Sequence, residues 1–545
     1  MSKISPQNLI KSHKYWRLVE MVPGILTWSA FFFIIFGSLL FPVFTADLII
    51  AYTLIWVFRT FHFAYNLSKS FHFSQRAQKV DWNKLLIELE TPENLNQLAD
   101  DSYDHLILEN KGKSFKAELL ERVGRLQKSN NYLKPSQVVH CITLVRANES
   151  YEVVKSSLDS YAQSNYDLKK VIFMFACEES QKESAENIYN QLKKEYGDKF
   201  QDFLVSYHPS NLPNELRGRA GNATWSAKEL KKYLDHKKIS YDHVILSSFD
   251  ADTVISQYFL SELTYRYCIT ENRVEVGYQP VPFYHNNIWD VPVFNRLVAI
   301  SCSFWQLSVS LRKDENKSFS SRSMSFQSVI DFDYWDTRVV QDDSRQFWTA
   351  FFVYNGRHYL ENIYSPVYMD AVLSESYLST IKSQYKQLRR WAWGVSDFPF
   401  IVFNMLASKE IPWTRKIYEC LHFLESVFFW ATGPVILLFA GAVPSIVNSA
   451  FRDTVLSHNL PIMMSNLMNI ASIGIIICII ISARIIPFET QKSAWKKTTL
   501  FLQWLLVPIV SVCLSAIPAI DAQTRLILNK RLDFNITQKS RKAKV

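Results

Sequence analysis

The sequence predicts an α/β domain with an open, mostly parallel sheet and helices on both faces, accompanied by α-helical transmembrane segments. Long stretches without Asp, Glu, Lys or Arg lie near both ends of the chain, and short apolar runs alternate with helix-like stretches in its middle. The mean hydropathy of −0.05 is therefore an average over two unlike parts. At 545 residues the chain is also too long for one ordinary domain.

Four charge-free stretches predict membrane-spanning helices, because a helix needs about 20 apolar residues to cross the hydrocarbon. They cover residues 21–46, 426–451, 454–483 and 498–520. A fifth candidate, residues 48–65, is interrupted by Arg59, and we expect this side chain to extend toward lipid headgroups. Pro508 and Pro518 favour a re-entrant or interfacial hairpin for the last stretch.

Basic residues predict the orientation. Lys14 and Arg17 precede the first span, and Lys69, Arg76 and Lys79 follow the second, with no Lys or Arg between the spans. Since positive residues stay in the cytoplasm, the middle of the chain is expected to be cytoplasmic in a multi-pass protein integral to the cytoplasmic membrane. The seven cysteines form no C-x-x-C pair, which agrees with a reducing compartment. The basic tail predicts contact with anionic lipid of the bilayer, and no nucleic-acid partner is expected.

The expected organisation has seven parts. These are a cytoplasmic N-terminus (1–20), two transmembrane helices (21–66), a helical connector (67–135), the α/β domain (136–400), an interfacial amphipathic segment (401–420), about three transmembrane or re-entrant helices (421–520) and a basic C-terminal tail (521–545).

The α/β domain is predicted from its alternating pattern. Buried strands are expected at residues 138–145, 171–176, 203–206 and 243–246, and helices at residues 153–162, 183–196 and 223–234. In open parallel sheets, ligands bind beyond the carboxyl ends of the strands. The polar residues that follow each strand are therefore the candidate site residues.

Such residues follow three of the strands. Arg146, Asn148 and Glu149 follow the first strand, Glu178 the second, and Asp250 with Asp252 the fourth. Two aspartates on one turn can both reach a divalent cation, as in Mg²⁺ or Mn²⁺ sites on nucleotide diphosphates. The chain has only 13 glycines and no glycine-rich phosphate loop, so a diphosphate would be held by metal and side chains.

Four short segments, in this order, carry a resemblance to a known family. They are Arg217-Gly218-Arg219-Ala220-Gly221-Asn222, Ser248-Phe249-Asp250-Ala251-Asp252, Gln341-Asp342-Asp343 and Gln387-Leu388-Arg389-Arg390-Trp391. With their membrane flanks they resemble the family 2 glycosyltransferases of the GT-A fold, particularly the membrane-integrated synthases of the cellulose, chitin and hyaluronan type. The resemblance covers about residues 136–400 plus the flanking membrane segments.

The resemblance implies a role for each candidate residue. Asp343 is the implied catalytic base with Asp342 beside it, and Asp250 and Asp252 are the implied ligands of Mg²⁺ or Mn²⁺. The implied nucleotide-sugar-binding residues are Arg146, Asn148, Glu149, Glu178, Arg219 and Asp250. Gln387, Arg390 and Trp391 are implied to bind the acceptor or product. The implied reaction is inverting transfer of a sugar from a nucleotide-sugar donor to a growing glycan or lipid-linked acceptor, for a polysaccharide of the cell envelope.

Departures from the family pattern leave the nucleotide, the sugar and processivity open. Val145-Arg146-Ala147 stands where the family usually has Pro-x-Tyr, Glu178 replaces an Asp, and Gln341-Asp342 replaces Thr-Glu. Two other functions remain open as well: transfer of a single sugar to a polyprenyl phosphate, and a non-catalytic membrane scaffold with a degenerate transferase domain.

Each candidate also has a purely structural interpretation. Asp250 and Asp252 could cap a helix that begins near Ser256, and Asp342 and Asp343 could be solvated acids at a helix start. Arg217 and Arg219 could belong to a plain basic loop. Residues 387–391 could lie on the membrane surface.

Overall fold

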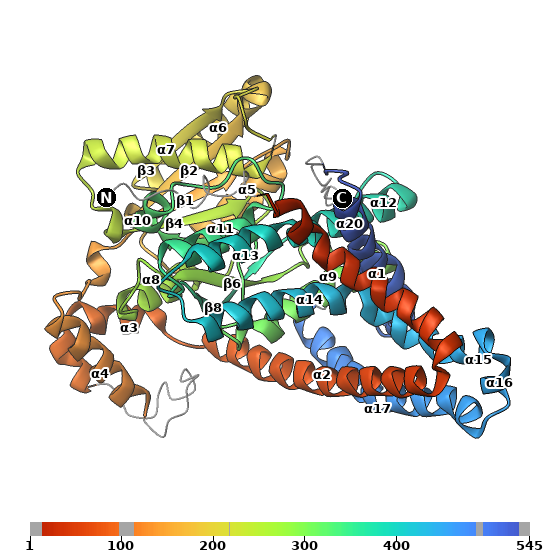
Figure 1. Cartoon of the computed structure of the whole chain (residues 1–545). Helices are drawn as coiled ribbons and strands as arrows, with labels where there is room; N and C mark the ends of the chain where they lie inside the picture. Colours follow the sequence, from red (N-terminus) through yellow and green to blue (C-terminus); the bar gives the residue numbers. More distant parts are fainter. Residues whose placement is uncertain (1–13, 98–113, 217, 487–493, 533–545) are drawn as a thin grey trace. The chain divides into compact units, whose positions relative to one another are not determined.

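The computed structural model describes residues 14–97, 114–216, 218–486 and 494–532. Arg217 and the outer parts of both predicted tails, residues 1–13 and 533–545, lie outside these ranges. The chain divides into two compact units (Figure 1). The membrane unit comprises residues 1–68, 287–308 and 371–545, and the sheet unit comprises residues 69–286 and 309–370.

The described part of the sheet unit contains eight strands in the order β3-β2-β1-β4-β7-β6-β8-β5. The strands are β1 (Val139–Val145), β2 (Val171–Glu178), β3 (Asp202–His208), β4 (Val244–Asp250), β5 (Val254–Ile255), β6 (Gly277–Phe283), β7 (Arg322–Ser325) and β8 (Leu360–Tyr368). β1 to β4 pair in parallel, which confirms the four strands expected from the apolar runs. Their carboxyl ends therefore meet at one edge of the sheet.

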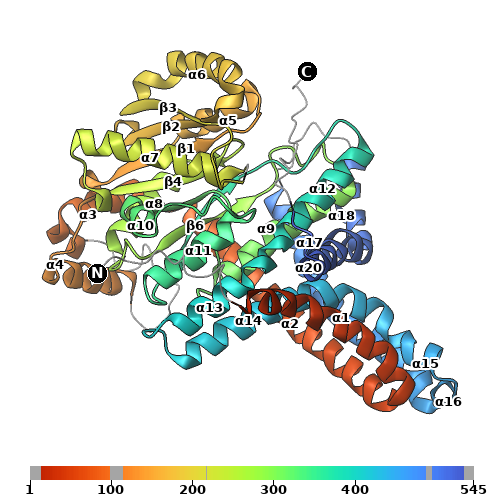
Figure 2. The same cartoon turned by 45° about the horizontal axis from the view of Figure 1, so that its top comes forward.

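Helices cover both faces of this parallel half because alternate strand residues point to opposite sides. Ile142 and Phe173 pack in a core with helices α5 (Tyr151–Ala162), α6 (Lys182–Tyr196) and α8 (Phe259–Ile269). Their neighbours Cys141 and Ile172 face α7 (Arg219–Lys237), α10 (Phe326–Asp331) and α11 (Asp342–Val353). Figures 1 and 2 show these helices around the sheet. The expected helices 153–162, 183–196 and 223–234 are confirmed as α5, α6 and α7.

The other half of the sheet is mixed and has no counterpart in the sequence prediction. β7 pairs antiparallel with both β4 and β6, and β6 pairs in parallel with β8. β7 has only four residues, and β6 carries Pro280 and Pro282 with a register shift between them. Short polar strands and prolines give no strand signal. Two further α-helices of this unit are α3 (Trp82–Glu90) and α4 (Phe115–Lys128), whose apolar sides join the α5–α6 core.

Among the described residues, five segments are long and apolar enough to span a membrane: Trp16–Leu40, Pro42–Ala77, Trp413–Val447, Val455–Ile485 and Thr498–Ile527. The second of these is helix α2, which belongs to the membrane unit up to Ser68. The unit also contains most of α9 (Val293–Ser310) and all of α12 (Tyr377–Ala392), α13 (Phe398–Ala407), α14 (Trp413–Phe439), α17 (Val455–Ile485) and α20 (Ile517–Ile527). With the mostly parallel sheet, these spans confirm the fold class predicted from the sequence.

The Arg59 side chain contacts other residues of the protein, which differs from the extension toward lipid headgroups expected from the sequence. Its guanidinium forms an ion pair with Glu425 of α14 and lies 4.5 Å from the ring centroid of Phe429. A carboxylate and an aromatic face together reduce the cost of placing a charge in an apolar helix. Close approach of the two helices depends on Gly433, since a Cβ there would lie 2.2 Å from the Trp56 ring.

Candidate active site

Asp250 is the last residue of β4, and the turn after it is fixed by α5. The amide of Thr253 donates to the carbonyl of Asp250 at 3.0 Å, which makes the turn tight. From α5, Ser157 Oγ donates to the carbonyl of Ala251 at 2.8 Å and the Tyr161 hydroxyl to that of Thr253 at 3.0 Å. These bonds fix the backbone on which Asp250 and Asp252 are placed.

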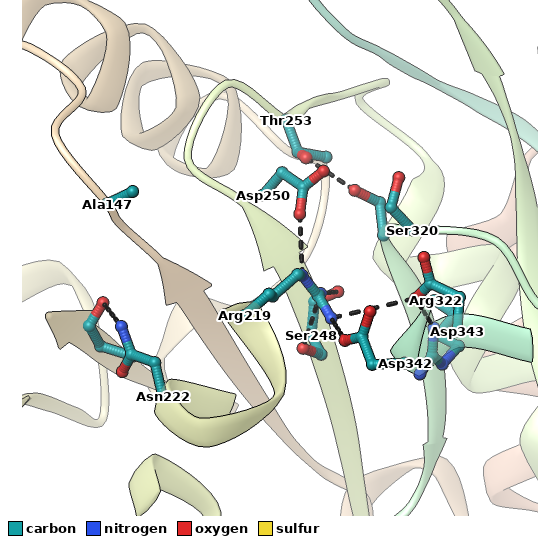
Figure 3. Close-up of polar contacts among 12 residues, drawn as sticks. Ala147, Arg219, Asn222, Ser248, Asp250, Thr253, Ser320, Arg322, Asp342 and Asp343 are labelled. Carbon is teal, nitrogen blue, oxygen red and sulfur yellow. Dashed lines mark hydrogen bonds and ion pairs between the residues drawn. The ribbon is translucent and has the colours of Figure 1, made fainter. Parts of the chain in front are cut away.

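Arg219, the first residue of α7, lies between the ends of β4 and α11 (Figure 3). Its Nε donates to Asp250 Oδ1 at 2.9 Å, and its Nη1 donates to Asp342 Oδ2 at 3.2 Å. Its Nη2 donates to the carbonyl and hydroxyl oxygens of Ser248, at 3.0 and 2.9 Å. One guanidinium thus joins three segments that are far apart in the sequence.

Asp342 and Asp343 open helix α11, where the helix N-terminus favours negative charge. Asp343 Oδ1 lies 4.0 Å from Arg219 Nη1 and forms an ion pair with Nη1 of Arg322 on β7. The Arg322 side chain is 1% exposed, whereas that of Asp343 is 16% exposed. Arg322 is therefore a buried counter-charge for a carboxylate that can still meet a ligand.

The close carboxylates change the pKa of their neighbours. Burial lowers the pKa of Arg219, but the charges of Asp250, Asp342 and Asp343 outweigh it, so the pKa is raised and the guanidinium stays charged. Burial raises the pKa of Asp343, and nearby Asp342 adds to the rise, although Arg322 and Arg219 oppose it. A carboxyl with a raised pKa is a better proton acceptor near neutral pH.

Asp250 is the more accessible carboxylate of the predicted metal pair, with a quarter of its side chain exposed. Asp252 is buried, and its Oδ2 accepts the backbone N–H of Asp370 at 2.8 Å. Within the described residues, no group of three or more His, Cys, Asp or Glu side chains could hold a metal ion. Two aspartates on one turn nevertheless suit a hard cation that takes its other ligands from phosphate oxygens and water.

Four of the residues expected to bind the nucleotide sugar lie at the ends of β1 and β2, and one of them, Glu178, is expected to contact the nucleoside. Arg146 is buried, and its guanidinium donates to Glu149 O at 2.8 Å and Ser184 Oγ at 3.2 Å. Glu149 Oε2 accepts the backbone N–H of Ala147 at 2.8 Å and of Asn148 at 3.1 Å. Arg146 and Glu149 thus shape the loop after β1, and Asn148 is exposed on it.

Asn222 of α7 ties this loop to the helix that carries Arg219. Its amide nitrogen donates to the carbonyl of Ala176 on β2 at 3.2 Å and reaches that of Arg146 at 3.5 Å. The segment from Gly218 to Asn222 therefore fixes the start of α7 against the parallel strands.

Gln387, Arg390 and Trp391, expected to bind the acceptor, lie on α12 of the membrane unit. Gln387 is buried, and its Oε1 accepts from Gln384 at 3.0 Å. The neighbouring Arg389 pairs with Asp521 of α20 at 2.8 Å. The role of Gln387, Arg390 and Trp391 in binding an acceptor stays a prediction.

Three of the structural interpretations do not fit this geometry. Helix α8 begins at Phe259 with Tyr258 as its cap, so Asp250 and Asp252 do not cap it. Asp342 is buried and ion-paired, which differs from a solvated acid at a helix start. Arg219 likewise lies within a carboxylate cluster and not in a plain loop.

Arg322 is the site residue that the sequence analysis missed. It lies opposite Ser248 in the antiparallel pair of β4 and β7, and it precedes Asp343 by 21 positions. A lone Arg in the polar run Arg-Ser-Met-Ser has no recognisable spacing to a carboxylate. Only the pairing of β7 brings it there.

No protein-family model matches the chain, and no curated protein matches it. Among solved structures, the mannosyltransferase PcManGT from Pyrobaculum calidifontis in complex with GDP-Man and Mn²⁺ covers 76% of this chain and 96% of its own, with 13% identity and a TM-score of 0.39. S. aureus TarS 1–349 in complex with UDP-GlcNAc covers 62% and 90%, with 10% identity and a TM-score of 0.30. GalNAc-T7 with UDP, GalNAc and Mn²⁺ covers 54% and 57%, with 10% identity and a TM-score of 0.29. These likenesses are distant, and neither substrate nor mechanism follows from them.

Replacing Arg322 by Met tests the buried ion pair. The raised pKa of Asp343 means that the folded protein binds this proton more tightly than the unfolded chain does. Protonation of Asp343 therefore adds to the free energy of unfolding at low pH, and this stabilisation is lost as pH rises through the pKa of Asp343 in the folded protein. Without Arg322 the charged form of Asp343 destabilises the fold further. We therefore expect Arg322→Met to lower the free energy of unfolding by about 3 kcal/mol at pH 8 and by less at pH 5, measured as shifts of the thermal unfolding midpoint.

The control for this prediction is Arg322→Met combined with Asp343→Asn. Removing the uncompensated charge should recover part of the stability at pH 8. Equal losses at both pH values, with no recovery in the double variant, would show that the ion pair is not what Arg322 contributes.

Proposed function

We propose that this protein is an inverting, metal-dependent family 2 glycosyltransferase of the GT-A fold. It moves a sugar from a nucleotide-sugar donor to a growing glycan at the cytoplasmic face of the membrane. The observation that carries the proposal is the bridge formed by Arg219. This guanidinium bonds to Asp250 and Asp342 and lies 4.0 Å from Asp343. The proposed phosphate-binding group (Arg219), metal-binding carboxylate (Asp250) and base (Asp343) therefore lie next to one another.

The diphosphate of the donor fits the start of α7. Arg219 is the first residue of this 19-residue helix, so its guanidinium and the helix N-terminus both favour an anion there. The site has a formal charge of −2 when all its groups are ionised. Four carboxylates (Asp250, Asp252, Asp342 and Asp343) face two guanidinium groups (Arg219 and Arg322). One divalent cation balances this charge.

The cation would be held by Asp250 and Asp252 together with phosphate oxygens, and either Mg²⁺ or Mn²⁺ suits these ligands. When bound, it supplies positive charge that stabilises the leaving diphosphate. Arg219 adds a second cation on the side of α7. Together they replace the glycine-rich amide cradle that this chain lacks.

Asp343 takes the proton of the acceptor hydroxyl as the new bond to the sugar C1 forms and the bond from C1 to the diphosphate breaks. Its raised pKa suits a proton acceptor at neutral pH. Arg322 holds the carboxylate from the buried side, and Asp342 engages Arg219. The candidate base Asp343 and the diphosphate-binding Arg219 are thereby held in fixed positions relative to each other.

The five spanning-length segments anchor the sheet unit to a bilayer, and the basic residues around the first two favour the cytoplasmic side. Gln387, Arg390 and Trp391 offer an amide, a guanidinium and a flat apolar ring, which suit a glycan or lipid-linked acceptor. This arrangement fits synthesis of a cell-envelope polysaccharide.

Asp343→Asn tests the base. Purified full-length protein with Mn²⁺ or Mg²⁺ should release nucleoside diphosphate from at least one donor in a panel of nucleotide sugars. The variant should lose at least about 100-fold in kcat, since the amide cannot accept the proton. Its Kd for the nucleoside diphosphate, measured by calorimetry, should stay within about threefold of the wild-type value, as the base does not bind the diphosphate.

Asp333→Asn is the matched control. Asp333 is exposed and has a φ of 60°, a conformation that Asn adopts as readily as Asp. Activity of this variant should be unchanged. No turnover of any donor by the wild type, or full activity of Asp343→Asn, would refute the proposal.

Product length tests the growing-glycan part of the proposal. Purified protein is supplied with donor and either a short glycan primer or a polyprenyl phosphate, and the primer should give a ladder of products. If each polyprenyl phosphate instead receives one sugar and no ladder forms, the enzyme is a single-sugar transferase.

A further inference from the structure

His208, the last residue of β3, lies between two carboxylates outside the Arg219 cluster. Its Nδ1 is 2.9 Å from Glu178 Oε2, and its Nε2 is 3.1 Å from Glu215 Oε1. The side chains of His208 and Glu215 are only 10% and 12% exposed, and that of Glu178 is 23% exposed. Glu178 is the residue expected to contact the nucleoside.

The chemistry of this cluster favours a charged imidazole. Nδ1 of the ring hydrogen-bonds with Glu178, and Nε2 lies 3.1 Å from Glu215 Oε1 without hydrogen-bond geometry, so two carboxylates stabilise a positive charge on the ring. Burial lowers the pKa of His208, but Glu178 and Glu215 outweigh it, so the pKa is raised. The Trp225 ring of α7 also lies near His208, with ring centroids 6.3 Å apart, and carries no charge.

The packing around Glu215 is tight enough to fix it. A Cβ at Gly221 would lie 1.8 Å from Glu215 Oε1 and 3.0 Å from His208 Cε1. Gly221 therefore lets α7 approach both side chains. Because Gly221 is only two residues from Arg219, the same helix start contacts both clusters.

Glu178 lies at the edge of the sheet where the candidate diphosphate site is found. Val145 is paired with Asp250 on one side and with Ala176 on the other, and Glu178 follows Ala176 by two residues. Two strand spacings separate β4 from β2, which is about 10 Å. A ligand with its diphosphate at Asp250 and Arg219 can therefore extend along this edge to Glu178.

We propose that His208 and Glu215 are positioning residues that hold Glu178 as an acceptor for the N–H edge of the donor's base, so that the nucleotide carries uracil or guanine. This inference rests on the proposed function. A carboxylate can only accept, and Oε2 of Glu178 is already held by His208. Uracil presents a ring N–H, and guanine a ring N–H with an amino group beside it. Cytosine and adenine present an unprotonated ring nitrogen, which a carboxylate repels.

The test measures Kd values of UDP, GDP, CDP and ADP for the full-length protein in detergent with Mg²⁺, by calorimetry. At pH 6.5 the wild type should bind UDP or GDP at least about tenfold more tightly than CDP and ADP. Glu178→Gln should lose this preference and bind CDP more tightly than the wild type does, since an amide can donate to a ring nitrogen. Glu179→Gln, which changes the neighbouring acid, should keep the preference.

Variants of His208 separate positioning from a merely structural role. His208→Ala should bring the four Kd values within about threefold of one another, whereas His208→Asn, whose amide can donate in place of Nδ1, should retain most of the preference. Thermal unfolding midpoints show that each variant is folded.

The outcomes are distinguishable. If none of the four nucleotides binds, the proposed function fails. If they bind without preference, if Glu178→Gln leaves the preference unchanged, or if His208→Asn loses as much as His208→Ala, this inference fails and the proposed function stands.

Discussion

The arrangement of the site depends on one guanidinium among three carboxylates. Arg219 touches Asp250 at the end of β4 and Asp342 at the start of α11, with Asp343 4.0 Å away. Without a cation these acidic side chains would repel one another at short range in a poorly solvated place. The position of Arg219 is in turn fixed by its helix, which Asn222 bonds to a carbonyl of β2. The position of Arg219 is thus set by the parallel half of the sheet.

This cluster is not the most stable way to fill the space. Taking several charges out of water costs more than well-packed apolar side chains of similar size would, even when every charge has a partner. Arg322 illustrates the cost, because within the described residues its buried Nε and Nη2 atoms have no hydrogen-bond partner. Perturbed groups that persist at the carboxyl edge of an α/β sheet are typical of functional sites. The cluster is therefore better explained by ligand chemistry than by stability.

The sequence predicted the parts of the molecule that depend on local patterns. Apolar runs located β1 to β4, and the polar residues after them included Asp250; the short segments with a family resemblance added Arg219, Asp342 and Asp343. Parts that depend on long-range pairing were not predictable. β7 is too short and polar to be recognised, so Arg322 was missed, and no spacing relates His208 to Glu215 or Arg59 to Glu425. Charges acquire partners through the fold, whereas the pattern along the chain shows only that a charge is present.

The central claim is that Asp250 and Asp252 hold a divalent cation on a nucleotide whose diphosphate contacts Arg219. The most direct measurement is a titration of full-length protein with Mn²⁺, followed by electron paramagnetic resonance, with and without UDP or GDP. We expect one of these nucleotides to tighten Mn²⁺ binding at least tenfold. Asp250→Asn and Asp252→Asn should abolish this gain, and Arg219→Gln should reduce it by weakening the binding of the diphosphate. Mn²⁺ binding that is the same in the wild type and in all three variants, with or without nucleotide, would contradict it.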